Sequence, residues 1–160
     1  MLSDETNPQQ RLFFKRIGEV YPDATLWGDG DGIDFSDSTQ GQGGTCYIIS
    51  ALSSLANYPD YIKSIFLEDE DLNNNGIYTL KFFIRGKPWL VTVDDIFLFQ
   101  NENNPSLYYS KLSSDNSMWS ALIEKAWAKL KGSYTQAWNG YNVNGLRTLT
   151  GAPVFTYKTH

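Results

Sequence analysis

Residues 40–56 have the sequence QGQGGTCYIISALSSLA, in which a glycine-rich loop runs directly into an apolar pattern. Apolar residues recur at helical spacing from Ile48 to Ala56, which predicts an amphipathic helix that begins near Thr45. Cys46 therefore stands at the N-terminus of a helix. The peptide dipoles at a helix N-terminus stabilise a thiolate, and glycines before it allow a substrate backbone to approach the sulfur.

The single cysteine has two opposite interpretations. In most soluble proteins a lone cysteine is a small, buried hydrophobic residue. At a helix N-terminus beside a glycine-rich loop it is instead a candidate nucleophile, and Gln40 stands six residues before it. The Gln40 amide can donate a hydrogen bond to the oxyanion that forms when a thiolate attacks a carbonyl, with the Cys46 backbone N–H as the second donor. These two residues are the predicted catalytic pair.

The composition of the 160 residues limits the classes of partner. Thirteen basic and 18 acidic residues give a net charge of -5, and no run of Lys or Arg is longer than a pair. Nucleic acids and anionic membranes both bind concentrated positive charge, so neither is an expected partner. No segment is apolar over the length of a signal peptide or a bilayer span, and a single cysteine fits a reducing compartment. We expect one cytoplasmic domain that binds neither nucleic acid nor a membrane.

Hydrophobic periodicity predicts an α+β arrangement on either side of the glycine-rich loop. An apolar pattern predicts a helix over residues 9–20. Alternation over residues 78–93 predicts a β-hairpin with its turn at Gly86 and Lys87. A further helix is predicted over residues 118–131, and the tail predicts a short helical turn near Leu146 and a strand over residues 154–157.

Several motifs together resemble those of calpain-type cysteine proteases. The segment over residues 40–47 is similar to the nucleophile segment of all papain-fold proteases, but Gly43 stands where papains have a disulfide cysteine. Four further blocks resemble segments of the calpain core and follow in the calpain order: VTVDD over residues 91–95, WSALIEKAWAKL over residues 119–130, GSY over residues 132–134 and LTG over residues 149–151. Several blocks in a fixed order are far more specific than one short motif.

The resemblance covers about residues 33–157 and implies a papain-like fold. The expected unit is the mainly helical N-terminal subdomain of the calpain core, with a central helix that carries the cysteine at its N-terminus and a small antiparallel β-hairpin. Residues 33–160 would form this subdomain. Residues 1–32 would be an N-terminal helix followed by a glycine- and aspartate-rich lead-in.

The resemblance also implies roles for individual residues. Cys46 matches the family's nucleophile, and Gln40 matches its oxyanion-hole glutamine. Gly140 falls where the family has a glycine that lines the substrate cleft. Trp138 beside it and Gly44 before the nucleophile complete the predicted peptide-binding residues. The implied activity is that of a calcium-dependent cysteine endopeptidase, and a protein or peptide partner is implied by this resemblance alone.

Calcium is the cofactor that the resemblance implies. Asp37, nine residues before Cys46, matches a carboxylate that binds a regulatory calcium in calpains. The usual second carboxylate is replaced by Ser117, and the loss of a charged ligand lowers the expected affinity. Two further departures flank the nucleophile, because Thr45 replaces an aspartate and Tyr47 replaces a tryptophan.

The rest of the catalytic machinery is expected to be missing from residues 1–160. In papain-fold proteases the histidine and asparagine follow the cysteine by more than about a hundred residues. The only histidine here is His160, at the chain end, which we interpret as an exposed terminal residue. We expect an incomplete triad and an inactive isolated chain, with a missing second lobe or a larger assembly as partner. The alternative is an inactive calpain-like half-domain that serves as a structural or protein-binding module.

Overall fold

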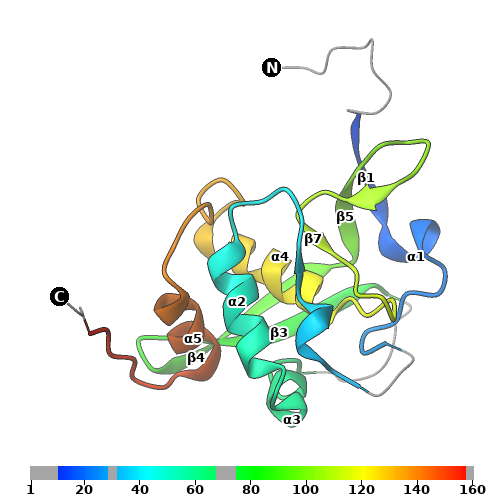
Figure 1. Ribbon diagram of the computed structural model, residues 1–160. Coiled ribbons are helices and arrows are strands. Elements are labelled where there is room, and N and C mark those ends of the chain that lie inside the picture. The colour runs from blue at the N-terminus through cyan, green and yellow to red at the C-terminus, as the bar shows by residue number, and fades with distance from the viewer. Residues whose placement is uncertain (1–10, 29–31, 68–74, 158–160) are drawn as a thin grey trace.

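The structure is a computed structural model that describes residues 11–28, 32–67 and 75–157. Helices and strands follow one another along the chain (Figure 1). Their order is β1 (Leu12–Arg16), α1 (Ile17–Val20), the 3-10 helix η2 (Phe35–Asp37), β2 (Thr39–Gln40), α2 (Cys46–Leu55), α3 (Pro59–Lys63), β3 (Ile77–Ile84), β4 (Lys87–Asp94), β5 (Ile96–Gln100), β6 (Ser106–Leu107), β7 (Ser110–Lys111), α4 (Trp119–Lys131) and α5 (Asn142–Thr150). The described strands form three small antiparallel sheets, β1-β5-β6, β2-β7 and β3-β4. The predicted α+β class is confirmed, whereas the mainly helical content stays a prediction.

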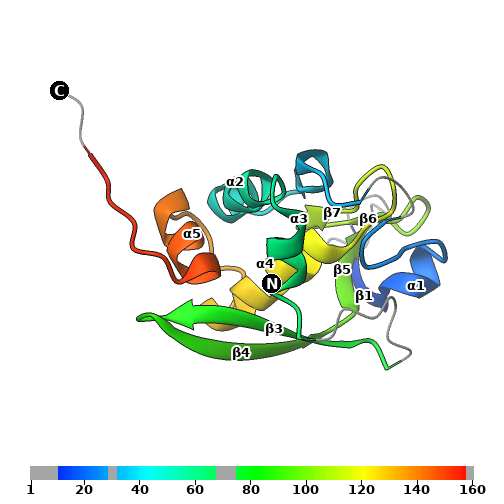
Figure 2. The same ribbon diagram turned by 90° about the horizontal axis from the view of Figure 1, so that it is seen from below.

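Helix α4 lies at the centre of the packing. Figure 2 shows it between the β3-β4 hairpin and α2. Every residue from Trp119 to Ala128 except Lys125 is buried, so the helix is covered on nearly all sides. It ends at Gly132, whose φ of +104° is a conformation that glycine adopts without a steric penalty. The helix predicted over residues 118–131 is confirmed.

The β3-β4 hairpin follows its predicted alternation. The two strands pair along their whole length, from Ile77 opposite Asp94 to Ile84 opposite Lys87. The turn residues Arg85 and Gly86 both have positive φ, as a tight two-residue hairpin turn requires. The turn therefore lies one residue earlier than predicted.

The start of the described chain contradicts the helix predicted over residues 9–20. Leu12–Arg16 form strand β1, which pairs antiparallel with β5, and only Ile17–Val20 are helical. Phe13 stacks on Phe99 of β5, with ring centroids 5.7 Å apart. The apolar spacing fits a helical period, but pairing with β5 satisfies the backbone hydrogen bonds and partly buries Phe13. This tertiary contact outweighs the local preference.

The end of the described chain contradicts the predicted strand. Residues 151–157 have neither helical nor strand structure, and Figure 2 shows them running away from the body of the molecule. A strand needs a partner for its backbone hydrogen bonds, and no described strand pairs with this segment. The helical turn expected near Leu146 is instead the nine-residue helix α5.

Helix α2 confirms the helix predicted after the glycine-rich loop. It packs against α4 and α5, and Ile48, Ala51 and Leu52 are buried. A side chain at Gly145 of α5 would lie 3.1 Å from Ile48 and 3.3 Å from Ala51, so glycine allows the two helices to approach closely. This contact holds α2 while its N-terminus faces outward.

Candidate active site

Cys46 is the first residue of α2, and its side chain is exposed. The next three residues, Tyr47 to Ile49, are buried. The helix is therefore held by its core contacts, while the thiol at its first position faces solvent. The predicted placement of Cys46 at a helix N-terminus is confirmed, and its role as nucleophile stays a prediction.

The first turn of α2 has backbone donors that no side chain occupies. The Thr45 carbonyl accepts the N–H groups of Ile48 and Ile49 at 3.0 and 3.2 Å. The Thr45 side chain does not cap the helix, because its hydroxyl donates to the Glu124 carboxyl instead. Among the described residues no group accepts a hydrogen bond from the Cys46 or Tyr47 backbone N–H. These two donors remain free for an anion, as an oxyanion hole requires.

Gln40 lies at the other end of the glycine-rich loop. It ends β2, where it pairs with Ser110 of β7, and its side-chain Nε2 donates to the Gly43 carbonyl at 2.5 Å. One of its two amide hydrogens therefore closes the loop, and the other is not used in this contact. The loop itself rests on the segment before β7, since a side chain at Gly41 would lie 1.8 Å from the Tyr109 carbonyl oxygen.

The predicted peptide-binding residues lie close to one another beside the start of α2. The Asn139 backbone N–H donates to the Gly44 carbonyl at 2.9 Å. A side chain at Gly44 would lie 2.6 Å from the Trp138 ring, and one at Gly140 would lie 2.7 Å from the ring of Tyr47. The structure thus brings Trp138 against Gly44, and Gly140 of the same loop against Tyr47. Trp138 is half-exposed, which leaves part of its ring available to a ligand.

Tyr47 joins the loop that carries Trp138 to the core. Its hydroxyl accepts from the Trp127 indole N–H at 2.7 Å and donates to the Ala137 carbonyl at 2.9 Å. The rings of Tyr47 and Trp127 meet edge to face with centroids 6.0 Å apart. Burial raises the pKa of Tyr47, so the hydroxyl stays protonated as a donor. The loop beside Cys46 is therefore tied to both α2 and α4.

The whole chain, residues 1–160, matches the family described as calpain family cysteine protease. The chain belongs to the calpain family. It is 32% identical to calpain clp-4 of Caenorhabditis elegans over 91% of this chain and 20% of that protein. It is 31% identical to calpain-8 of Homo sapiens over 91% of this chain and 20% of that protein. The calpain-type cysteine protease DEK1 of Zea mays is 34% identical over 74% of this chain and 5% of its own length.

This calpain-family chain spans about a fifth or less of the length of these relatives. Within the described residues no helix is long and apolar enough to cross a bilayer. His160 lies outside the described residues, so its position relative to Cys46 stays undescribed.

The described side chains around Asp37 do not fit a complete calcium site. Asp37 is buried, and its Oδ2 accepts from the Asp34 backbone N–H at 2.8 Å and from the Trp119 indole N–H at 3.3 Å. Ser117, in place of the family's second carboxylate, pairs its hydroxyl with another buried serine. No group of three His, Cys, Asp or Glu side chains that could hold a metal occurs among the described residues, which exclude residues 29–31. Calcium binding by Asp37 stays a prediction.

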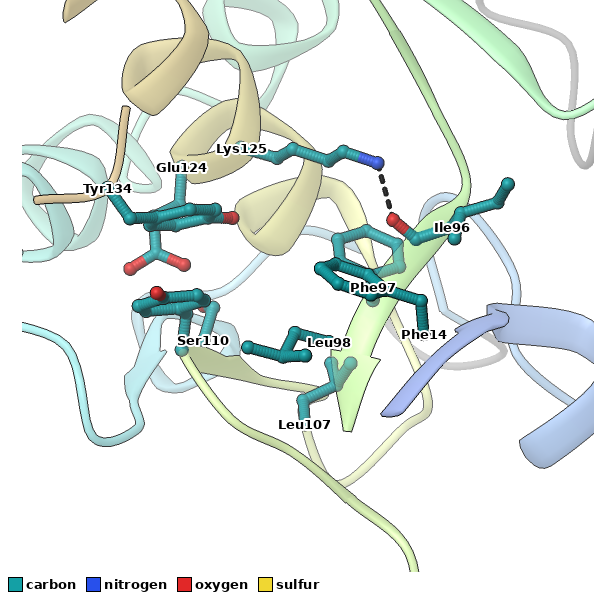
Figure 3. A pocket seen from close by; sticks show the side chains of 10 residues that line it. Phe14, Ile96, Phe97, Leu98, Leu107, Ser110, Glu124, Lys125 and Tyr134 are labelled. Carbon is teal, nitrogen blue, oxygen red and sulfur yellow. Dashed lines mark hydrogen bonds between the residues drawn. The ribbon is translucent and has the colours of Figure 1, made fainter. Parts of the chain in front are cut away.

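Glu124 is a buried residue near the start of α2 for which the sequence motifs indicated no role. Its side chain is 1% exposed, and burial raises its pKa to about 7 against the hydrogen bond from Thr45, which lowers it. Figure 3 shows the carboxyl group pointing from α4 toward Ser110, with the ring of Tyr134 beside it. A signal was present in its helical neighbours, because small residues at positions 120, 121 and 128 mark a second packed face of α4.

Proposed function

We propose that this chain is the nucleophile-bearing part of a calpain-type cysteine endopeptidase. The observation that supports this most is the exposed Cys46 thiol at the first residue of α2, beside backbone N–H groups that no side chain caps. A buried structural cysteine would have neither feature. Membership of the calpain family makes peptide-bond hydrolysis the activity that these features serve.

In the proposed reaction the Cys46 thiolate attacks the carbonyl carbon of a peptide bond. The resulting oxyanion accepts hydrogen bonds from the Cys46 backbone N–H and from the free amide hydrogen of Gln40. The carbon–nitrogen bond then breaks, the amine leaves with a proton, and water hydrolyses the thioester. Removal of the thiol proton needs a base, and protonation of the leaving amine needs an acid. We assign both roles to an imidazole on a second protease lobe.

The peptide substrate would lie along the wall formed by Gly44, Trp138 and Gly140. Glycine at position 44 allows a peptide backbone to approach Cys46, and the exposed part of the Trp138 ring offers an apolar surface. The second lobe would form the opposite wall. An intracellular setting belongs to the same proposal, because it keeps the lone thiol reduced.

The test compares peptide hydrolysis by the natural protein that carries this domain with hydrolysis by its Cys46→Ser variant. The proposal expects turnover by the natural protein and none by the variant, with unchanged peptide binding. A natural protein that binds peptides but never cleaves them would support the alternative, an inactive calpain-like binding module. Equal turnover by both proteins would exclude Cys46 as the nucleophile.

A further inference from the structure

One buried carboxyl group connects the two ends of the glycine-rich loop. Glu124 of α4 accepts a hydrogen bond from the Thr45 hydroxyl, and the Ser110 backbone N–H favours the ionised form of the same carboxyl group and lowers its pKa. On one side the carboxyl group contacts Thr45, which is next to Cys46 in the chain. On the other side it lies at Ser110, the strand partner of Gln40.

The same carboxyl group keeps the start of α2 uncapped. Threonine before a helix commonly accepts a hydrogen bond from a first-turn N–H. Here the Thr45 hydroxyl points to Glu124, and the side chain makes no cap. A carboxylate can accept from Thr45 and Ser110 with its two oxygens, whereas an amide of the same shape presents an NH₂ group to one of these donors. Glutamine at this position would therefore satisfy only one of the two contacts.

The surroundings make this connection rigid. The rings of Tyr109 and Tyr134 stack with centroids 3.6 Å apart, and a side chain at Gly43 would lie 2.9 Å from the Tyr109 ring. Both tyrosines interact electrostatically with Glu124 and are the titratable side chains that face it from the neighbouring loops. The loop can therefore shift little unless the contacts of the carboxyl group change.

We infer that Glu124 is a positioning residue that sets the separation between the Gln40 amide and the Cys46 backbone N–H. It acts through Ser110 on one side and Thr45 on the other. The inference rests on the proposed function, in which these two groups stabilise an oxyanion. Beyond that function, we infer that the Glu124 side chain, which does not contact the substrate, maintains the relative positions of the Gln40 amide and the Cys46 backbone N–H.

The test uses two electrophiles on the same thiol. With p-nitrophenyl acetate, the Cys46 sulfur bonds to the acetyl carbon through a tetrahedral oxyanion, and p-nitrophenolate leaves with the electron pair of the broken C–O bond. With iodoacetamide, sulfur displaces iodide and no oxyanion forms. Because the chain has a single cysteine, the part of each rate that is lost in Cys46→Ser reports on Cys46 alone. Neither reaction needs a histidine to protonate the leaving group.

The expected signature is a loss of acylation without a loss of alkylation. Gln40→Ala should slow acylation by about tenfold and change alkylation by less than about twofold, because only the first reaction uses the oxyanion donors. Glu124→Gln and Thr45→Val should show the same split at about three- to tenfold. Thr45→Ser, which keeps the hydroxyl, should restore the natural acylation rate. Ala126→Gly, an equally buried change on the same helix, should leave both rates unchanged.

The possible outcomes test the oxyanion hole and the positioning role of Glu124 separately. If Gln40→Ala shows the split but Glu124→Gln and Thr45→Val do not, Glu124 is not a positioning residue although the oxyanion hole is right. If Gln40→Ala shows no split, the oxyanion assignment fails and the role of Glu124 fails with it. A parallel fall of both rates in the Glu124 and Thr45 variants would indicate a merely structural role and would also overturn the inference.

Discussion

Cys46 and Glu124 differ in their access to water, and this difference determines what each can do. The thiol is exposed at the start of α2, so it can meet a substrate. The carboxyl group lies beneath the same helix end and is 1% exposed, so its interactions are with protein groups. One residue is suited to react and the other to hold its surroundings in place.

We expect Cys46 in the folded protein to react with iodoacetamide within about tenfold of its rate in the unfolded chain, because the thiol is already exposed. A buried cysteine reacts only when the protein opens and would be slower by about a thousandfold or more. The measurement is the alkylation rate with and without denaturant, followed by mass. Labelling that requires denaturant would contradict the nucleophile assignment.

Glu124 should make the protein less stable as the pH rises. The pKa of the folded state is about 7, above the ordinary value of 4.5, so between these values the folded protein holds a proton that the unfolded chain has released. The stabilisation is complete below pH 4.5 and is lost as the pH rises through 7, by about 3 kcal/mol in total. Urea unfolding between pH 4 and 8 measures it.

Glu124→Gln should abolish this part of the pH dependence, because glutamine does not titrate. The pKa values of Asp34 and Asp94 are lowered by hydrogen bonds, with Lys125 contributing at Asp94, so these groups favour stability at higher pH. The difference between the natural protein and the variant isolates Glu124. Glu102→Gln, an exposed change, is the matched control. Parallel curves for the natural protein and Glu124→Gln would show that folding does not raise the pKa of Glu124.

The loops beside α2 are held together by close backbone approach. The loop that carries Trp138 bonds to Gly44 through the Asn139 N–H, and Tyr47 anchors it from below through Ala137. These contacts leave no room for side chains at two glycines, Gly44 and Gly140. The surface beside Cys46 is therefore set by contact between two loops and not by either loop alone.

Gly44→Ala should displace the Trp138 ring, because the new methyl group would lie 2.6 Å from it. We expect a loss of stability of about 1 to 3 kcal/mol and a shift of the Trp138 indole signal in the NMR spectrum. Gly18→Ala is the control, since nothing lies within 4 Å of its added carbon. An unchanged Trp138 signal in Gly44→Ala would show that the two loops do not touch in solution.

The molecule leaves aromatic surface uncovered in the loop after α4. Trp138 and Tyr141 are 51% and 76% exposed and lie three residues apart in the chain. Exposed aromatic groups near one another are typical of surfaces that bind a partner. The chain also spans only about a fifth of the length of its first relatives. Both observations support the proposal of a second lobe over this face.

Residues 1–160 produced alone should hydrolyse no peptide, with or without calcium. The chain has one histidine, His160, and a thiolate without a nearby imidazole lacks an acid for the leaving amine. Fluorogenic peptides measure turnover, and circular dichroism of the same sample shows that the protein is folded. Turnover that disappears in Cys46→Ser would make His160 a candidate base and overturn the prediction.

Local patterns were enough to determine a large part of this protein. The sequence predicted α2 with Cys46 at its start, the β3-β4 hairpin and α4, because each follows a hydrophobic period within one segment. The order of its motifs was enough to indicate the calpain family. Such patterns depend only on residues within one segment, so the sequence of that segment is enough to read them.

Only the tertiary structure decided the features that join distant segments. Residues 12–16 form a strand because β5 lies beside them, which the apolar spacing of the segment does not reveal. Trp138 meets Gly44 across 94 positions, and Glu124 meets Thr45 across 79. Small neighbours in the sequence mark the face of α4 that carries Glu124 as packed, but only the fold shows that Thr45 is its partner. The physical reason is that burial and hydrogen-bond partners depend on the whole fold, whereas periodicity depends only on near neighbours.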